Sequence, residues 1–418
     1  MTSVRTIVRA ERLGPAFDLL AEYEPGGCFM ERAGVGVAAG AGGGDPWIMT
    51  LSGPQTGTTP PTLELLFGGL DVGGLPADAP APLLFGSLPF DPHRSGHFVH
   101  PRRVVRRDRQ GETWVLRSDD EPGNVAIPEP TRGRSEPNPP FSDMQVFPEP
   151  PPDAYQRAVA EAVALIHRGR LRKVVLARTI RVEAGRTLDP RGLLKHLRAF
   201  EPDGYSFAVD TGEGRTLVGA SPELLVSRFG NEIRANPLAG SAPRSGDPVE
   251  DRENAERLGS SPKDRHEHAI VVEDVFHTLH PLCRDLTYDR DPQLLATANV
   301  WHLSTRFRGV LKDPRVTALD LVRALHPTPA VCGEPRDEAM RTIEALEPVP
   351  RGAYAGAVGW MDANGDGIWA LALRCAELHG TTARLFAGAG IVADSDPTAE
   401  VDETERKFRA FLDSLRWG

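Results

Sequence analysis

The sequence contains few cysteines and no long hydrophobic run. Four cysteines are spread over 418 residues, and none belongs to a CxxC pair. This spacing argues against a zinc ribbon or a disulfide framework, and reduced cytoplasmic thiols are expected. No stretch approaches the roughly 18 apolar residues of a membrane-spanning helix, and the N-terminus lacks the apolar core of a signal peptide. We therefore expect a cytoplasmic protein without a membrane partner.

The sequence also lacks an excess of positive charge, because 48 lysines and arginines stand against 58 aspartates and glutamates. The formal net charge is −10 at pH 7, whereas broad binding to nucleic acid or to an anionic membrane needs a basic surface. No nucleic-acid partner is therefore expected. A small anionic substrate is still compatible with this composition, because its recognition depends only on local charge.

Proline is concentrated in one segment. Residues 128–152 hold nine prolines among 25 residues. Such a segment is extended and excludes a regular helix or a central strand. It predicts a linker between a strand-rich N-terminal part, residues 1–127, and a C-terminal part, residues 153–418.

Two single charged residues lie at unusual places in the second part. Lys173 shares one face of a predicted strand, residues 171–180, with Val175 and Ala177. It either snorkels from a wet strand end or occupies a closed pocket, where loss of water favours the neutral amine and lets it act as a base. Glu223 is presented by a sharp turn after a predicted strand. A lysine and a glutamate of this kind could supply a base and an acid.

Two predicted helices each carry two carboxylates three residues apart, and so on one face. The pairs are Asp264 with Glu267 and Glu400 with Glu403, and Lys407 follows one turn later. A solvated helix face with an i,i+4 Glu–Lys pair accounts for either pair alone. Two pairs that face each other would instead form an oxygen-ligand site suited to Mg²⁺. Spacing alone leaves both alternatives open.

Residues 385–408 are expected to form a strand, a glycine turn and a helix. Gly388 and Gly390 lack a Cβ, so another group can approach the backbone closely there. Asp396 and Pro397 are a typical helix start, because aspartate caps free N–H groups and proline fits the first helical position.

Two segments resemble metal-binding motifs, but for each a structure without a metal is favoured. His93, His97 and His100 fall in a predicted loop that has no evident carboxylate or cysteine ligands, so a solvated loop is favoured. Residues 362–367 resemble the start of an EF-hand loop, but the twelfth position would be Leu373 and the flanks are strand-like. A hairpin turn is the favoured interpretation.

Short motifs along residues 150–418 resemble the chorismate-utilising enzyme family. This family includes isochorismate, salicylate, anthranilate and aminodeoxychorismate synthases. FGSLPFD at residues 85–91 is similar as well. The C-terminal motifs, in chain order, are KVVLAR from Lys173, GASPEL from Gly219, PLAG from Pro237, KDRHEH from Lys263, HPTPAVCG from His326, YAGAVG from Tyr354, ALALRCAE from Ala370 and the stretch 385–408.

The resemblance implies an α/β (α+β) fold with two large, mostly antiparallel β-sheets packed together and helices on the outer faces. It also implies chorismate as the small-molecule substrate and dependence on Mg²⁺. Carried over by motif, Glu267 and Glu403 would ligate Mg²⁺, and Asp264 and Glu400 would support the ion through water. Lys407 would lie close to this site.

The same motifs imply a substrate-binding set. Backbone N–H groups near Gly388 and Gly390, together with the metal, would hold the ring carboxylate of chorismate. Tyr354 and Arg374 would hold the enolpyruvyl carboxylate. Two further positions that the resemblance assigns to substrate binding are Ala239 and His302.

Two positions distinguish members of the family by their nucleophile. Lys173 matches the members that add water, so no amidotransferase subunit is expected. Ala239 stands where aminodeoxychorismate synthases have a lysine that attacks the ring. The expected activity is therefore that of an isomerase, isochorismate synthase. Lys173 would deprotonate a water that attacks C2 of chorismate, and Glu223 would protonate the departing C4 hydroxyl.

Two alternatives accompany this expectation. Salicylate synthases share Lys173 and Glu223 but also expel pyruvate, and they tend to carry a threonine where Cys332 stands. A catalytically silent homologue that only binds is disfavoured by the intact set of site residues. The sequence leaves open the pathway, menaquinone or siderophore biosynthesis, and the choice between monomer and homodimer. It also gives no interpretation of Glu334.

Overall fold

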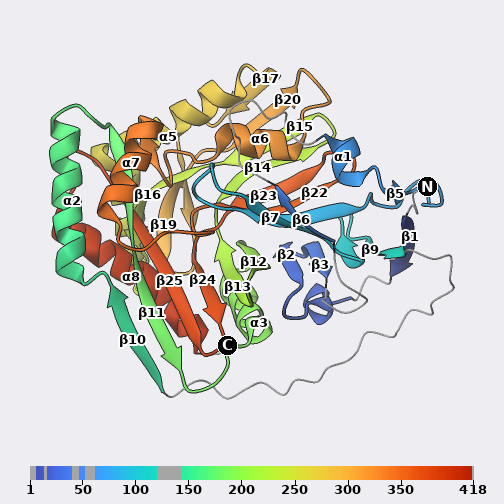
Figure 1. Cartoon of the computed structure of the whole chain (residues 1–418). Helices are drawn as coiled ribbons and strands as arrows, with labels where there is room; N and C mark the ends of the chain where they lie inside the picture. Colours follow the sequence, from blue (N-terminus) through green and yellow to red (C-terminus); the bar gives the residue numbers. More distant parts are fainter. Residues whose placement is uncertain (1–5, 14–16, 40–46, 52–61, 120–142, 417–418) are drawn as a thin grey trace.

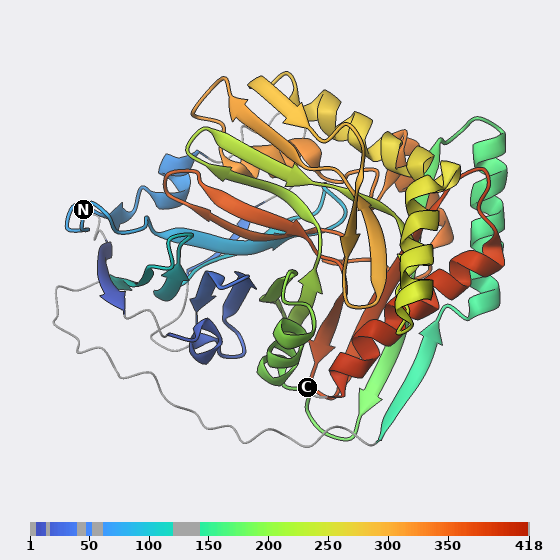
Figure 2. The ribbon, with the colours of Figure 1, turned by 180° about the vertical axis from the view of Figure 1, so that it is seen from behind.

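Two large β-sheets with helices on their outer faces form the body of the molecule (Figures 1 and 2). The computed structural model describes residues 6–13, 17–39, 47–51, 62–119 and 143–416. The fold expected from the resemblance is confirmed by this architecture. Within these residues the strands form three sheets.

The larger sheet has 13 strands and is antiparallel apart from one parallel pair, β1 with β5. Its order is β10-β11-β25-β24-β13-β12-β2-β3-β8-β9-β1-β5, and β21 pairs with β11 beside this path. The strands are β1 (Thr6–Leu13), β2 (Cys28–Arg32), β3 (Val35–Ala39), β5 (Leu70–Asp71), β8 (Arg103–Arg107), β9 (Thr113–Asp119), β10 (Met144–Glu149), β11 (Lys173–Ala184), β12 (Tyr205–Gly212), β13 (Arg215–Ser221), β21 (Gly333–Glu334), β24 (Cys375–His379) and β25 (Thr382–Ile391).

The second sheet has nine strands in the order β17-β20-β15-β14-β23-β22-β6-β7-β4. They are β4 (Trp47–Leu51), β6 (Leu83–Leu88), β7 (Gly96–His100), β14 (Leu224–Phe229), β15 (Glu232–Asn236), β17 (Cys283–Tyr288), β20 (Phe307–Leu311), β22 (Ala357–Asp362) and β23 (Gly367–Leu371). A small third sheet joins β16 (Leu238–Pro243), β19 (Val300–Ser304) and β18 (Gln293–Ala296).

Helices cover the outer faces of these sheets (Figure 1). Helices α2 and α8 pack on β11 and β25, α3 packs on β12 and β13, and α6 packs on β14 and β23. The helices are η1 (Leu19–Glu22, 3-10), α1 (Leu63–Phe67), α2 (Pro152–His167), α3 (Pro190–Phe200), α4 (Pro248–Ser260), α5 (Pro262–Leu279), α6 (Ala318–Leu325), α7 (Arg336–Leu346) and α8 (Pro397–Leu415).

Strands from both sides of the proline-rich segment join the same two large sheets, with the N-terminal strands at one end of each sheet and the C-terminal strands at the other. Strand β2 pairs with β12, and β6 pairs with β22. Within the segment itself, Met144–Glu149 forms the edge strand β10, and residues 128–142 lie outside the described residues. The edge position suits the prolines, because an edge strand needs backbone donors on one side only.

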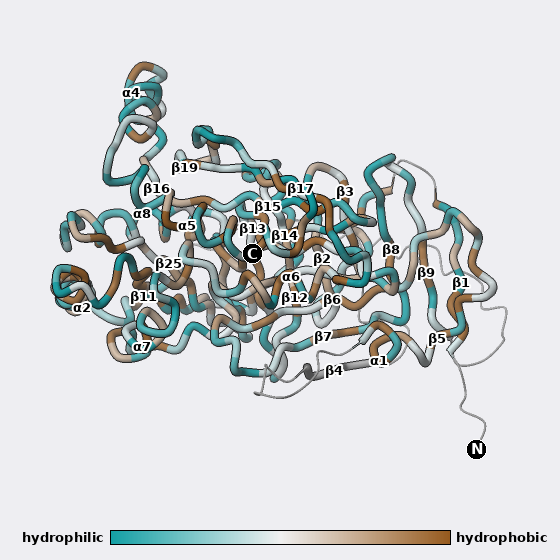
Figure 3. The backbone as a smooth tube through the Cα atoms, turned by 90° about the horizontal axis from the view of Figure 1, so that it is seen from above, coloured by the Kyte–Doolittle hydropathy of each residue, from teal (hydrophilic) through white to brown (hydrophobic). Residues whose placement is uncertain are grey.

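The interior between the two sheets is aromatic and apolar. Phe98 and Trp369 lie with their ring centroids 5.9 Å apart, and hydrophobic stretches follow the strands at the centre of the molecule (Figure 3). A second cluster lies under α8, where Phe408 and Leu415 pack with Ile180 and Leu385. Each such side chain contributes about 1.5–3 kcal/mol when it leaves water.

Helix α8 is tied to β11 by one buried arginine. The Arg178 side chain is 1% exposed and bonds Thr404 Oγ1 at 2.9 Å and Glu405 Oε2 at 2.7 Å. Its guanidinium also lies 5.2 Å from the ring centroid of Phe408. As predicted, Asp396 caps the helix by accepting hydrogen bonds from two backbone N–H groups. These contacts fix which face of α8 is turned toward the sheet.

Candidate active site

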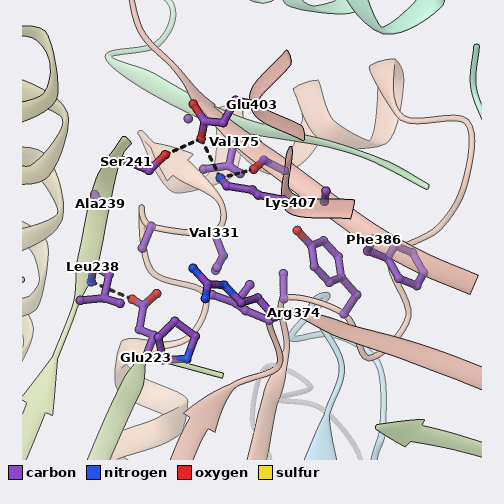
Figure 4. A pocket seen from close by; sticks show the side chains of 18 of the residues that line it. Val175, Glu223, Leu238, Ala239, Ser241, Val331, Arg374, Phe386, Glu403 and Lys407 are labelled. Carbon is purple, nitrogen blue, oxygen red and sulfur yellow. Dashed lines mark hydrogen bonds and ion pairs between the residues drawn. The ribbon is translucent and has the colours of Figure 1, made fainter. Parts of the chain in front are cut away.

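A pocket opens where β11, β25, β16, α5 and α8 meet (Figure 4). Its space, including the open mouth, is about 940 Å³, which suits a small molecule. Ten of the thirteen residues that the sequence singled out line it. They are Glu223, Ala239, Glu267, His302, Tyr354, Arg374, Gly388, Gly390, Glu403 and Lys407.

Lys173 lies directly behind this lining. Its side chain is 1% exposed, and its Nζ is 3.0 Å from Glu267 Oε1. The snorkelling alternative is therefore wrong. The neighbouring strand permits this contact only through Gly390, because a Cβ there would lie 2.1 Å from Glu267 Oε1 and 3.1 Å from Lys173 Cε.

Glu223 lies between β13 and β14 and points into the other side of the pocket (Figure 4). Its Oε1 accepts a hydrogen bond from Leu238 N at 3.2 Å. Burial raises the pKa of Glu223 to about 8, although the bond from Leu238 and the charge of Lys173 oppose this shift. At neutral pH this carboxyl group is mostly protonated, so it has a proton to donate.

The two carboxylate pairs come from the first two turns of α5 and α8. Glu403 Oε1 accepts from Ser241 Oγ at 2.9 Å and from Lys407 Nζ at 2.7 Å. Burial alone would raise the pKa of Glu403, but Lys407 and Ser241 outweigh it and lower the pKa. Burial and the nearby Glu403 raise the pKa of Glu400, whose Oε1 accepts from Lys263 Nζ at 3.0 Å.

Asp264 and Glu400 lie outside the pocket lining. Asp264 is held near the backbone of Gly240, where a Cβ would come within 3.0 Å of Asp264 Cβ. Burial raises the pKa of Asp264. No group of three His, Cys, Asp or Glu side chains in the described part of the chain is placed to hold a metal ion by itself.

The predicted glycine turn is wrong, because β25 continues to Ile391 and both glycines lie inside the strand. They pair with β11, Gly388 opposite Ala177 and Gly390 opposite Val175. Ala177 and Val175 direct their N–H groups away from β25, to Glu347 and Cys332. In an antiparallel pair whose two opposed residues do not bond to each other, both residues direct their N–H and C=O groups away from the partner strand.

The outer edge of β25 therefore carries the N–H and C=O groups of Gly388 and Gly390. Lys407 Nζ donates a hydrogen bond to Gly388 O at 2.8 Å, which agrees with a Gly388 carbonyl that points away from β11. The described pairing of β25 with β24 ends at Leu385. Backbone groups beyond that point face the pocket, so the strand presents donors as the turn was expected to do.

Arg374 reaches the pocket from a backbone in the left-handed region, with φ of 47°. Its NH1 is 3.1 Å from Glu201 Oε1, and its NH2 is 2.6 Å from His302 Nε2. Burial lowers the pKa of His302 well below the usual range. The ring is thus neutral, so Nε2 accepts from Arg374 and Nδ1 donates to Gly240 O at 3.4 Å.

Tyr354 lines the pocket and stacks on Phe386, with ring centroids 4.8 Å apart and planes 9° apart. Its hydroxyl oxygen would lie 3.1 Å from a Cβ added at Gly388.

Sequence reasoning missed several residues that contact the site. Ser241 directly follows the PLAG motif and Lys263 is the first residue of the KDRHEH motif, so both had an available signal, whereas Glu201 lies in no such motif.

The histidine prediction is partly wrong. His97 and His100 lie in strand β7 rather than in a loop. The buried His100 ring bonds Leu83 O at 2.9 Å and Ser118 Oγ at 3.0 Å, so it is a core residue. The predicted hairpin at residues 362–367 is confirmed as the β22–β23 connection. Glu334 lies in β21, where its backbone pairs with that of Lys173 in β11. The Glu334 side chain is outside the pocket lining.

Residues 124–416 match the family described as chorismate binding enzyme. With the fold and the pocket, this match shows that the chain belongs to the chorismate-binding enzyme family. It is 43% identical over 342 residues to isochorismate synthase DhbC of Bacillus subtilis, covering 80% of this chain and 81% of that protein. It is 38% identical to isochorismate synthase EntC of Escherichia coli, covering 79% and 80%.

Solved structures agree with this membership. The candidate 2,3-dihydroxybenzoate-specific isochorismate synthase DhbC of Bacillus anthracis superposes with a TM-score of 0.80 at 36% identity, covering 96% of this chain and 99% of that one. Anthranilate synthase component I of Streptococcus pneumoniae gives a TM-score of 0.69 at 24% identity, covering 96% and 92%, which shows a shared fold. The described residues contain no helix long and apolar enough to cross a membrane.

Gly390→Ala tests how closely the Lys173–Glu267 pair depends on the missing Cβ. Because the new Cβ would overlap Glu267 Oε1, we expect the free energy of unfolding to fall by about 1–3 kcal/mol and the Glu267 side chain to move in a crystal structure. Gly246→Ala is the control, since a Cβ there meets open space. Equal unfolding midpoints for both variants in denaturant would contradict the packing described.

Proposed function

We propose that this protein is an isochorismate synthase, an isomerase that converts chorismate to isochorismate. The observation that carries the proposal is the placement of a buried lysine and a protonated glutamate around one pocket that also presents carboxylates and an arginine. The isochorismate synthases among its relatives support the same activity. The reaction adds water at C2 and removes the C4 hydroxyl.

Lys173 is the proposed base and Glu223 the proposed acid. Lys173 is buried with Glu267 on one side of the pocket, and Glu223 lies with Leu238 on another (Figure 4). Lys173 in its neutral amine form takes a proton from the water that attacks C2 and becomes an ammonium, and Glu223 gives its proton to the departing hydroxyl. The double bonds of the ring shift, and the two groups exchange roles in the reverse direction.

Mg²⁺ is the cation that the donor set fits. Glu267 and Glu403 bring carboxylate oxygens from two helices into the same pocket, and each lies within hydrogen-bond distance of a lysine Nζ. Mg²⁺ is commonly bound by one or two carboxylates, with water and substrate oxygens completing its shell. Asp264 and Glu400 would act through water. When bound, the ion would neutralise the substrate carboxylate and orient the ring.

The two carboxylates of chorismate have separate partners in this proposal. The ring carboxylate lies against the backbone edge of Gly388 and Gly390, beside Lys407. The enolpyruvyl carboxylate is bound by Arg374 and Tyr354. Further contacts come from the lining residues Ala239 and His302.

Water is the nucleophile in this reaction, so no amidotransferase subunit is required. All four cysteines are free and buried, which suits the reducing cytoplasm. Monomer and homodimer both fit the proposal. One relative is named a vibriobactin-specific isochorismate synthase and one solved structure a menaquinone-specific one. The proposed chemistry fits either pathway.

Product analysis tests the proposed activity. With chorismate and Mg²⁺, the protein should form isochorismate without pyruvate or salicylate, as resolved by chromatography. Lys173→Met should lower kcat by about 10²–10⁴-fold because the base is lost, whereas Lys195→Met on the exposed side of α3 should leave it unchanged. Salicylate with pyruvate would support salicylate synthase, and no turnover would leave only a binding role.

The pH dependence of kcat/KM tests the acid. Glu223 must be protonated to donate, and its pKa is raised to about 8. The forward rate should therefore be lost as pH rises through about 8. Glu223→Gln should lower the rate and remove this alkaline limb. An unchanged limb in the variant would assign the titration to another group.

A further inference from the structure

The outer edge of β11 has a gap directly beside the residues that form the active site. Strand β21 pairs with this edge at Lys173 and Val174, and β10 pairs with it from Thr179 onward. Between these points, no strand of the described chain pairs with the edge. Unpaired backbone groups in a buried strand are costly, so Val175 and Ala177 need other partners.

Two side chains supply most of these partners. Ala177 N donates to Glu347 Oε1 at 2.7 Å, and Val175 O accepts from Arg351 NH2 at 2.7 Å. Glu347 and Arg351 also bond to each other through both carboxylate oxygens, with Arg351 Nε to Glu347 Oε2 at 2.8 Å. Their side chains are 6% and 3% exposed. The ion pair thus takes the place of a missing strand.

The same arginine connects β11 to two other walls of the pocket. Its NH1 donates to Val331 O at 2.6 Å, in the loop after α6. Its backbone O accepts from Tyr354 N at 3.0 Å, at the turn that presents the tyrosine ring. The guanidinium lies 4.1 Å from the ring centroid of Phe90, which limits its movement on that side.

We infer that the Glu347–Arg351 pair is a positioning device that holds β11 with Lys173, the Val331 loop and Tyr354 at fixed separations. Four of the five N–H donors of Arg351 are used by Glu347, Val175 and Val331. Although Arg351 borders the pocket, it has little capacity left to bind a substrate carboxylate. This inference rests on the proposed function, because its readout is chorismate turnover.

Arg351→Met and Arg228→Met form a matched pair of variants. Arg228 is also a buried arginine that bonds one carboxylate, Asp366, and two backbone carbonyls, but it lies on β14 away from the pocket. Both variants should lose similar thermal stability. At a temperature where both are folded, only Arg351→Met should lose kcat, by about 100-fold, because a displacement of about 1 Å has that effect. KM should change less than threefold.

Three results would overturn the inference. They are a kcat for Arg351→Met within threefold of Arg228→Met, a rise in KM with unchanged kcat, and unaltered amide hydrogen exchange at Ala177 in Arg351→Met. If Arg351→Met does not fold, Arg351→Lys replaces it with the same expected result, because an ammonium cannot make these planar contacts. Absence of turnover in the unmodified protein would instead contradict the proposed function, and hydrogen exchange would still test the positioning.

Discussion

Buried charge is the constraint on which this site depends. Each buried ion that lacks a partner costs several kcal/mol, and the pocket region holds several carboxylates close together. Three of them pair with lysines: Glu267 with Lys173, Glu403 with Lys407 and Glu400 with Lys263. Glu223 belongs to none of the ion pairs of the described residues, and burial raises its pKa so that it stays protonated. The proposed roles of Glu223 as the acid and of Glu267 and Glu403 as cation ligands follow from this distribution of partners.

The fold brings these groups together from distant parts of the chain. Lys173 comes from a sheet strand, Glu267 from α5 and Glu403 from α8, and Gly390 leaves the space in which the first two meet. Arg178 anchors α8 on the strand that carries Lys173. The geometry therefore depends on packing between elements that lie far apart in the chain, because Lys173 and Glu267 are 94 residues apart and Lys173 and Gly390 are 217 residues apart. Local sequence patterns do not report such contacts.

Local signals in the sequence predicted local structure well. The start of α8 at Asp396 and the hairpin at residues 362–367 follow from capping and turn chemistry, and both are confirmed. The resemblance supplied the fold and the residues that meet in the pocket. The glycine turn was mispredicted because pairing with β11 extends β25 through Gly388 and Gly390. That pairing depends on a strand about 200 residues away.

The supporting residues could not be found from sequence for the same reason. Glu201 and Glu347 directly follow the last residues of α3 and α7, and in the sequence they look like ordinary surface glutamates. Their roles arise only because Arg374 and Ala177 reach them in the folded chain. Buried polar groups bond to whichever partners the packing places beside them. Neither a motif nor the hydrophobic periodicity predicts which residues those partners are.

The central claim is that solvent water, activated beside Lys173, attacks C2 while the C4 hydroxyl leaves. Turnover of unlabelled chorismate in water enriched with oxygen-18 tests it most directly, with mass spectrometry of the isolated isochorismate. The account predicts one solvent oxygen in the product, located at C2. Isochorismate that retains only its original oxygens would contradict it, because the hydroxyl would then have migrated within the substrate.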